Sequence, residues 1–179
     1  MDKFNLSEDD LPYFRTLHSL AFRRLGIKKE NVMQRKHYVD LGNKINMRID
    51  YNEYDEEQTG IFTTHSDYLR VIQLAQLRGI TPEQQYNLRE HSQDLSVRDL
   101  KILDNELKAY KKQYGLIDFN DMITQFIKSD VCPKFDTVFI DEAQDLSRMQ
   151  WDMATALMFN AEDSFIAGDD DQAIFRWAG

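Results

Sequence analysis

The pattern of apolar and polar positions separates a helical middle from a C-terminal part in which strands and a helix alternate. Two short runs of β-prone apolar residues, 136–140 and 164–167, end abruptly in acidic and polar residues. Short runs without alternation are typical of strands that are buried on both faces of a parallel sheet. Residues 146–159 between them carry apolar side chains at helical spacing, so the stretch predicts one β-α-β unit. Both acidic ends would then share the sheet edge at which open parallel sheets bind ligands.

The middle of the chain carries clear start and stop signals for helices. Each expected helix follows a polar residue that can cap it, and two of them end at a glycine. The start signals are Ser66 or Asp67, Thr81 with Pro82 and Gln84, Ser96, and Asp118, and the stop signals are Gly79, Gly115 and the region near Lys128. Apolar residues recur every three or four positions within these stretches, which indicates helices that pack against a core.

The N-terminal part gives weaker signals. Residues 13–18 indicate a short strand, and residues 19–25 indicate a helix that begins at a capping serine and stops at Gly26. Residues 28–46 have a helical and basic pattern, and residues 48–60 have no periodicity and indicate an acidic connection.

These elements favour an α/β domain with an all-helical insertion. We expect residues 28–113 to form the helical insertion subdomain, and residues 1–27 and 114–179 to belong to one parallel-sheet domain.

Composition limits the setting in which the chain works. At 179 residues with 42% hydrophobic content the chain can bury a core, and its single cysteine, Cys132, cannot form an internal disulfide. No apolar run approaches the roughly 20 residues that span a bilayer, and the N-terminus lacks a signal-peptide pattern. We therefore expect a cytoplasmic protein without a membrane partner.

The net charge is −9, but the charges are unevenly distributed along the chain. Such a total argues against nucleic-acid binding, because phosphate contacts supply most non-specific affinity. Residues 11–48, however, hold nine Lys and Arg residues against Glu30 and Asp40. This segment is either a surface that faces a polyanion or a solvated helix face.

The acidic strand ends suit phosphate chemistry. Asp141 could hold a divalent cation, since Mg²⁺ favours one or two carboxylates together with phosphate oxygens. Glu142 could orient or deprotonate a water that attacks a phosphoryl group, and the amide of Gln172 could contact both that water and a γ-phosphate. The alternative interpretation is that Asp141 and Glu142 cap the following helix and favour its dipole.

Two further features could contact nucleic acid. Phe175 and Trp177 follow Gln172 closely, and aromatic side chains in such a loop suit stacking on unpaired bases, although they could equally be buried. His18, considered alone, is more often a structural residue than a functional one.

Together these residues resemble superfamily-one DNA helicases of the UvrD/Rep type. Residues 138–145 are similar to the family's Walker B motif, and residues 168–177 are similar to its third motif. Residues 16–19 resemble its Thr-x-His-Ser element, which contacts single-stranded DNA, and residues 116–121 resemble the segment where the chain returns from the helical insertion.

The resemblance implies a partial RecA-like parallel sheet of the P-loop NTPase type, with ATP and Mg²⁺ as cofactors. Asp141 would bind Mg²⁺, Glu142 would activate water, and Gln172 would report the γ-phosphate. Asp145 and Asp169 would couple the two motifs.

The same resemblance implies single-stranded DNA as a partner. Phe175 and Trp177 would stack on its bases, and Thr16 and His18 would lie near its backbone.

Two departures from the family pattern shape the expectation. None of the glycines is followed by lysine, so the family's phosphate loop is absent from these 179 residues, and Ala178 replaces a common arginine. We expect an interior piece of an ATP-dependent DNA helicase or translocase of 3′ to 5′ polarity, which lacks the phosphate loop and the second motor domain and is inactive alone. One alternative is a non-catalytic DNA- or protein-binding module from a split or decayed helicase gene, docked with a companion chain that carries the phosphate loop. Another is a metal-dependent nuclease.

Overall fold

The computed structural model describes residues 13–49, 66–91 and 94–169. This part of the chain is mixed α/β and mostly helical, and its sheet has two parallel strands. In chain order the elements are α1 (Leu17–Arg24), the 3₁₀ turn η2 (Lys29–Asn31), α2 (Arg35–Ile45), α4 (Asp67–Arg78), α5 (Pro82–Asn87), α6 (Val97–Tyr114), α7 (Phe119–Lys128), β1 (Phe135–Ile140), the 3₁₀ turn η4 (Ala143–Asp145), α8 (Arg148–Phe159) and β2 (Ala161–Ile166). Within the described ranges, no helix is both long and apolar enough to cross a bilayer.

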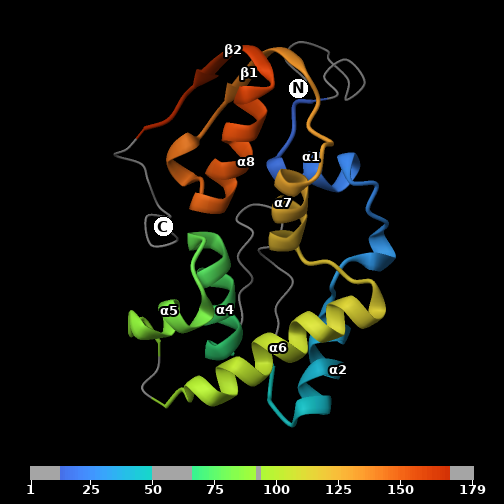
Figure 1. Ribbon diagram of the computed structural model, residues 1–179, viewed down its shortest axis with the longest axis vertical. Helices are drawn as coiled ribbons and strands as arrows, with labels where there is room; N and C mark the ends of the chain where they lie inside the picture. The colour runs from blue at the N-terminus through green and yellow to red at the C-terminus, as the bar shows by residue number, and fades with distance from the viewer. Residues whose placement is uncertain (1–12, 50–65, 92–93, 170–179) are drawn as a thin grey trace, which may run out of the picture.

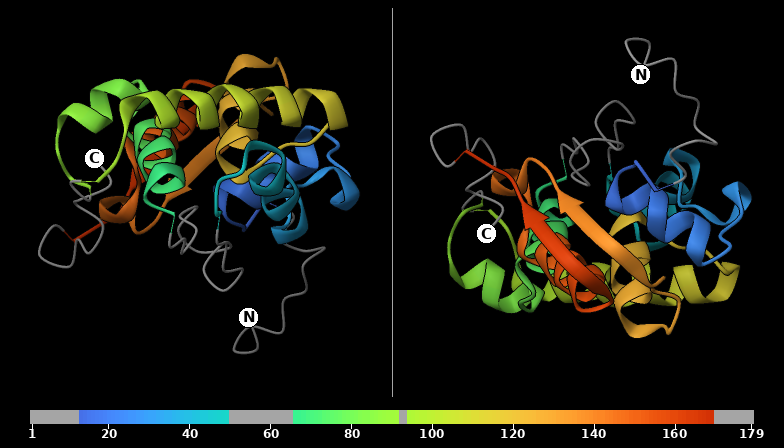
Figure 2. Two further views of the ribbon diagram at one scale, coloured as in Figure 1. Left: turned by 90° about the horizontal axis from the view of Figure 1, so that it is seen from below. Right: turned by 90° about the horizontal axis from the view of Figure 1, so that it is seen from above.

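The sheet and the longest helix lie at opposite ends of the molecule. Strands β1 and β2 form one end together with α8, and α6 crosses the other end beside α2 (Figure 1). Seen from above in Figure 2, the two strands lie in front and α8 lies behind them. Helix α4 contacts both α6 and α8, and so connects the two ends.

The buried apolar side chains form two clusters. The first joins α1, α7, β1 and α8 and includes Ile123, Phe126 and Met153. The second joins α2, α4 and α6 and includes Leu100 and Leu103, which are fully buried. The apolar stripes predicted on the helices are therefore core positions.

The helix starts that were predicted from capping residues are confirmed. In each case a polar side chain accepts a hydrogen bond from a backbone N–H of the first turn, and these side chains are those of Ser66, Thr81, Ser96 and Asp118. Gly79 and Gly115 end α4 and α6 in the left-handed region, with φ of 67° and 62°. Glycine adopts this conformation without a Cβ penalty, which is why these helices stop there.

The predicted β-α-β unit is confirmed as well. Strands β1 and β2 are parallel, and their register pairs Val138 with Ser164 and Ile140 with Ile166. Both strands begin earlier than the apolar runs indicate, at Phe135 and Ala161.

The predicted strand over residues 13–18 is wrong. Helix α1 begins at Leu17, and Thr16 caps it by accepting a hydrogen bond from the Ser19 backbone N–H at 3.2 Å. A capping residue has extended backbone angles and precedes apolar helical positions, so this short stretch imitates a strand in sequence. Ser19 therefore lies within the helix and does not begin it.

The helix predicted over residues 28–46 is shorter than expected. Helix α2 covers only Arg35–Ile45, because the preceding residues pair with another segment. Val32 forms a parallel bridge with Ile117, and the Met33 N–H donates to the Ile117 carbonyl at 2.9 Å. Most of the predicted acidic connection, residues 50–65, lies outside the described residues.

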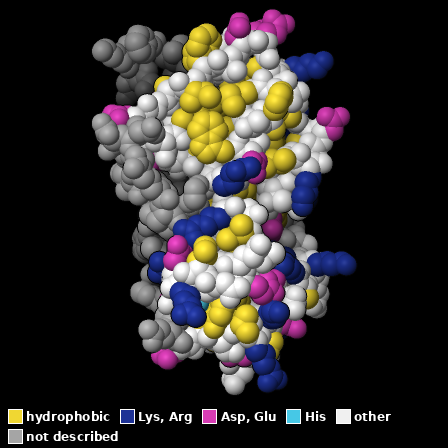
Figure 3. All heavy atoms as spheres, turned by 60° about the vertical axis from the view of Figure 1, so that its left-hand side comes forward, with side chains coloured by type: hydrophobic (Ala, Val, Ile, Leu, Met, Phe, Trp, Pro, Cys, Tyr) yellow, Lys and Arg dark blue, Asp and Glu magenta, His cyan; other side chains and the backbone are white. Residues whose placement is uncertain are grey.

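The expectation that the strands are buried on both faces is also wrong. Val138 and Ile140 are buried against the first cluster, whereas Phe139 on the opposite face is 73% exposed. Phe165 is 56% exposed and stacks on Phe139 with ring centroids 5.0 Å apart. No described element covers this face, which leaves the two aromatic rings in contact with solvent. Figure 3 likewise shows apolar side chains gathered near the sheet end of the molecule.

Candidate nucleotide and nucleic-acid sites

The loops that follow β1 and β2 lie against each other at the carboxyl edge of the sheet. The Ala167 N–H donates to the Ile140 carbonyl at 2.8 Å, and the Ala143 N–H donates to the Ala167 carbonyl at 3.0 Å. The pairing of the strands thus continues into both loops. This confirms the prediction that the two acidic strand ends share one edge.

Asp141 and Glu142 form an exposed turn at this edge. Asp141 Oδ1 accepts a hydrogen bond from the Glu142 backbone N–H at 3.0 Å. Glu142 has φ 52° and ψ 40°, a left-handed conformation that is uncommon for a residue with a side chain. Such a conformation persists only where the surrounding structure holds it, as the paired loops do here.

The structure contradicts the capping part of the alternative interpretation of these acids. Ser147 caps α8, and its side chain accepts a hydrogen bond from the Gln150 N–H at 3.3 Å. Glu142 precedes η4 but makes no capping hydrogen bond with its side chain. Both carboxylates therefore face solvent without a helix-capping role.

A side chain that the sequence reasoning did not single out joins the two loops. Gln144 donates from Nε2 to Glu142 Oε2 at 2.6 Å and accepts at Oε1 from the Asp169 N–H at 3.0 Å. The predicted coupling residues lie nearby, since Asp145 N–H donates to the Glu142 carbonyl at 3.0 Å. The available signal was a polar residue two positions after the strand-end acids, but its partner Asp169 is distant in sequence.

The described acids offer a divalent cation a limited set of ligands. Among the residues that the structure describes, no group of three His, Cys, Asp or Glu side chains could hold a metal ion. The exposed carboxylate of Asp141 fits Mg²⁺, which takes one or two protein carboxylates and completes its shell with water and phosphate oxygens. Gln172, Phe175 and Trp177 lie outside the described residues.

A second candidate site lies between α1, η2 and α7. It is a pocket of about 620 Å³ lined by Thr16, His18, Ser19, Phe22, Lys29, Val32, Met33, Gln34, Phe119 and Met122. The walls are mostly apolar, and the exposed Lys29 carries a positive charge at the rim. The two N-terminal residues predicted to lie near DNA, Thr16 and His18, both line this pocket.

His18 is buried and makes an edge contact with Phe119, with ring centroids 5.6 Å apart. Burial lowers the pKa of His18 to about 4, against an opposing effect of the nearby Asp118 carboxylate. The imidazole is therefore neutral at pH 7, so it can hydrogen-bond to a ligand but cannot attract phosphate by charge.

Acidification is expected to destabilise the fold through His18. Its folded-state pKa lies below its unfolded value, so the unfolded chain binds more protons between about pH 6.5 and 4. The stability that the neutral imidazole provides is present above pH 6.5 and is lost as the pH falls, by about 3 kcal/mol in total. Urea unfolding across this range should show a steeper loss for the wild type than for His18→Asn. An equal loss of stability with falling pH in both proteins would show that His18 does not cause this pH dependence.

The sequence matches the family described as UvrD/REP helicase N-terminal domain over residues 4–179. It is 34% identical over 85 residues to the ATP-dependent DNA helicase PcrA of Bacillus subtilis, which covers 42% of this chain and 11% of that protein. It is 28% identical over 109 residues to the ATP-dependent DNA helicase Rep of Buchnera aphidicola, which covers 56% of this chain and 16% of that protein. A probable DNA helicase II homolog of Mycoplasma genitalium is 29% identical over 89 residues, which are 48% of this chain and 12% of that protein. The chain thus spans only a small part of the length of these relatives.

Proposed function

Because this chain belongs to the UvrD/Rep helicase family, we propose that it forms part of the motor of an ATP-dependent DNA helicase or translocase, of 3′ to 5′ polarity as the resemblance implies. The observation that supports this best is the shared edge of the sheet. There the loops after β1 and β2 are hydrogen-bonded to each other and present Asp141 and Glu142 to solvent. Ligands of open parallel sheets bind at this edge.

At the nucleotide end, this chain supplies the groups that act on a terminal phosphate. Asp141 would hold Mg²⁺, and Glu142 would orient the attacking water and accept its proton. Gln172, outside the described residues, would contact the γ-phosphate, and Asp145 and Asp169 would couple the two loops. Bound Mg²⁺ would neutralise the charge that develops on the phosphate oxygens.

The exposed sheet face supports a larger, RecA-like parallel sheet. A two-stranded sheet is marginal alone, and parallel strands normally have both faces covered. The stacked rings of Phe139 and Phe165 form an apolar surface that such a cover would bury. We propose that a further polypeptide, in the same protein or in a companion chain, completes this sheet and carries the phosphate loop.

The two apolar clusters support the proposed division of the chain. One cluster belongs mainly to residues 1–27 and 114–179, and the other belongs mainly to the helical insertion of residues 28–113. Leu77 of α4 packs in the first cluster, so the insertion is anchored to the motor part through this helix.

At the DNA end, the pocket between α1 and α7 suits an unpaired base. Phe22 and Phe119 offer aromatic surface, and Lys29 at the rim can contact the adjoining phosphate. Thr16 and His18 line the same pocket, in keeping with the family element that they resemble. Phe175 and Trp177, which lie outside the described residues, would stack on further bases, as the resemblance implies.

Binding of single-stranded DNA tests this function directly. The chain has two tryptophans, so a Trp151→Phe variant leaves Trp177 as the only tryptophan. We expect an oligonucleotide to quench its fluorescence at low salt and to lose affinity as salt increases. The Trp177→Phe variant, which retains Trp151 on α8, should show little quenching. Unchanged emission in the Trp151→Phe variant at high oligonucleotide concentration would remove the stacking assignment.

Lys29 allows a test of the pocket itself. Lys29→Gln is expected to reduce the slope of log affinity against log salt concentration by about 1, because one phosphate contact is lost. Lys134→Gln removes another exposed charge, directly before β1 and away from the pocket, and should leave the slope unchanged. Equal slopes for wild type and Lys29→Gln would place the DNA elsewhere.

The exposed aromatic face also favours a second candidate, a binding module that docks with a companion chain and has no turnover of its own. Adding a polypeptide that carries the phosphate loop separates the two functions. Restored ATP hydrolysis supports the motor, whereas tight association without hydrolysis supports the binding module.

A further inference from the structure

We propose that Gln144 is a positioning residue that fixes the carboxylate of Glu142 against the loop after β2. Its side chain donates from Nε2 to Glu142 Oε2 at 2.6 Å and accepts at Oε1 from the Asp169 N–H at 3.0 Å. One amide thus holds the side chain of one loop and the backbone of the other. This inference deepens the proposed function, on which its catalytic part rests.

The chemistry of the two partners fixes the orientation of the amide. A backbone N–H can only donate and an ionised carboxylate can only accept, so Oε1 must face Asp169 and Nε2 must face Glu142. Glutamate at this position would lack the donor, and methionine would lack both groups. Glutamine carries both the donor and the acceptor, and its side chain is long enough to reach both partners.

The close approach of the two loops depends on Gly168. A Cβ built on Gly168 would lie 2.6 Å from Gln144 Oε1 and 3.2 Å and 3.3 Å from the backbone nitrogens of Gln144 and Ala143. A side chain at position 168 would therefore displace the amide of Gln144 and crowd the backbone of the first loop. Glycine at this position and glutamine at position 144 form a matched pair across the two loops.

The two hydrogen bonds of Gln144 connect the carboxylate of Glu142, which we propose orients water, to the loop after β2. Glu142 stands in a left-handed backbone conformation directly before η4, and the hydrogen bond from Gln144 Nε2 fixes the direction of its side chain. The loop that Gln144 holds continues in sequence towards Gln172, which we propose contacts the γ-phosphate. The position of the Asp169 backbone is therefore linked to the Glu142 carboxylate through the side chain of Gln144.

The fold itself does not depend on this bridge. The loops are also joined by backbone hydrogen bonds between Ala167 and Ile140 and between Ala143 and Ala167. Gln144 is only half-buried and packs in neither apolar cluster. Its replacement should leave the urea midpoint of unfolding unchanged, which allows a positioning role to be separated from a structural one.

Amide hydrogen exchange tests the bridge in the chain itself. In Gln144→Met the Asp169 amide loses its acceptor and should exchange about five- to tenfold faster, as expected for one hydrogen bond. Gln144→Glu keeps an acceptor for this amide, so its exchange should stay slow. Gln113→Met makes the same chemical change on the exposed surface of α6 and is the control. Equal Asp169 exchange in wild type and Gln144→Met would overturn the bridge.

Turnover tests the positioning role in a protein that unites these residues with a phosphate loop. Gln144→Glu and Gln144→Met should each lower kcat about tenfold without raising KM for ATP, because the bridge acts on Glu142 and not on nucleotide binding. In a Glu142→Gln background they should have no further effect. Additive losses would overturn the proposal, since Gln144 would then act independently of Glu142. Absence of turnover in the unmutated protein would instead refute the proposed function, and amide exchange would still decide whether the bridge exists.

Discussion

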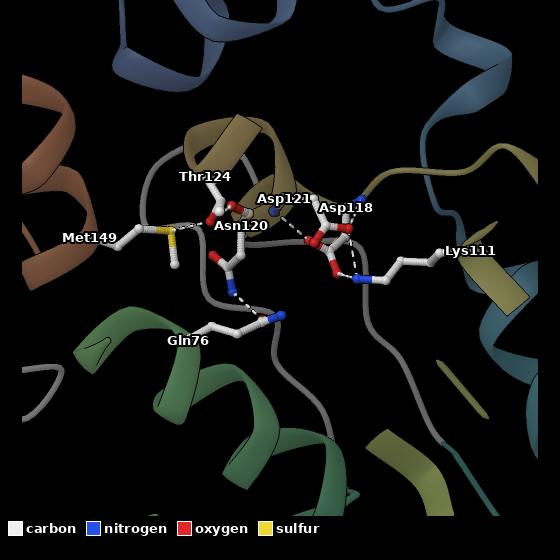
Figure 4. Close-up of polar contacts among 7 residues, drawn as sticks. All are labelled: Gln76, Lys111, Asp118, Asn120, Asp121, Thr124 and Met149. Atoms are coloured by element: carbon white, nitrogen blue, oxygen red, sulfur yellow. Dashed lines mark hydrogen bonds and ion pairs between the residues drawn. The ribbon is translucent and has the colours of Figure 1, made fainter. Parts of the chain in front are cut away.

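Replacing Lys111 by methionine is expected to lower the free energy of unfolding by about 3–5 kcal/mol. Lys111 lies at the end of α6, and its ammonium group contacts Asp118 Oδ2 at 2.8 Å and Asp121 Oδ2 at 2.6 Å. Figure 4 shows its side chain reaching both carboxylates at the start of α7. Methionine keeps the apolar stem but leaves two carboxylates unpaired, one of them buried.

The size of this effect follows from the burial of the cluster. Lys111 and Asp118 are each less than a tenth exposed, and burial with the nearby Asp118 raises the pKa of Asp121 despite its contact with Lys111. The two carboxylates raise the pKa of Lys111 although burial acts in the opposite direction. Without the ammonium group, the folded chain must hold two neighbouring negative charges away from water, which is unfavourable.

Chemical unfolding at several pH values distinguishes this mechanism from a general packing defect. In Lys111→Met the folded state should hold protons on these carboxyl groups more tightly than the unfolded state. The deficit relative to wild type should therefore shrink as the pH falls from about 7 towards 4. A deficit that does not change with pH would contradict the electrostatic explanation.

Two control variants complete this experiment. Lys112→Met changes the exposed neighbour and should stay within about 0.5 kcal/mol of wild type. Adding Asp118→Asn and Asp121→Asn to Lys111→Met removes both charges and should recover part of the loss, because asparagine can still cap α7. An equal loss in Lys112→Met would show that the burial of the charge is not the cause.

Local signals predicted the helices well because capping is a local interaction. Ser96 and Asp118 bond to backbone groups three residues away, so both partners lie in the same short stretch of sequence. Gly115 ends α6 for an equally local reason, its left-handed backbone. The parallel pairing of β1 and β2 followed from two apolar runs separated by a helical stretch.

The wrong predictions concern contacts between distant segments. Residues 31–33 pair with Ile117, and nothing in residues 28–46 indicates this partner. Phe139 and Phe165 belong to unbroken apolar runs, which cannot reveal whether the second face of a strand is covered in this chain. Thr16 was misread for a different reason, since an extended capping residue has the local features of a strand end.

In the candidate site, too, residues with local signals were predicted, and a residue with a distant partner was missed. The acids at positions 141 and 142 were found because their type and place after a strand point to phosphate chemistry. Gln144 was not found, since its role depends on Asp169, whose backbone reaches it only through the strand pairing. The roles assigned to Asp145, Asp169 and the residues beyond position 169 remain predictions.

Glu142→Gln is expected to lower kcat for ATP hydrolysis about 100- to 10,000-fold in a protein that unites these residues with a phosphate loop. Glutamine has the size of glutamate but cannot accept the proton of the attacking water. Its Oε1 can still accept the hydrogen bond from Gln144 Nε2, so the geometry of the loop should persist. Steady-state hydrolysis with and without single-stranded DNA, together with nucleotide affinity, measures the effect. Affinity should change little, because this carboxylate acts on the water and not on the nucleotide.

Glu162→Gln is the matched control, because it removes one exposed carboxylate from β2, far along the strand from the acidic edge, and should keep wild-type turnover. The 179-residue chain assayed alone should hydrolyse ATP negligibly in either form, since none of its glycines precedes a lysine that could cradle phosphate. Wild-type turnover in Glu142→Gln would remove the water-orienting role from this residue. DNA-stimulated hydrolysis by the chain alone that Glu142→Gln abolishes would place the carboxylate correctly but would require a phosphate-binding loop of another kind within these residues.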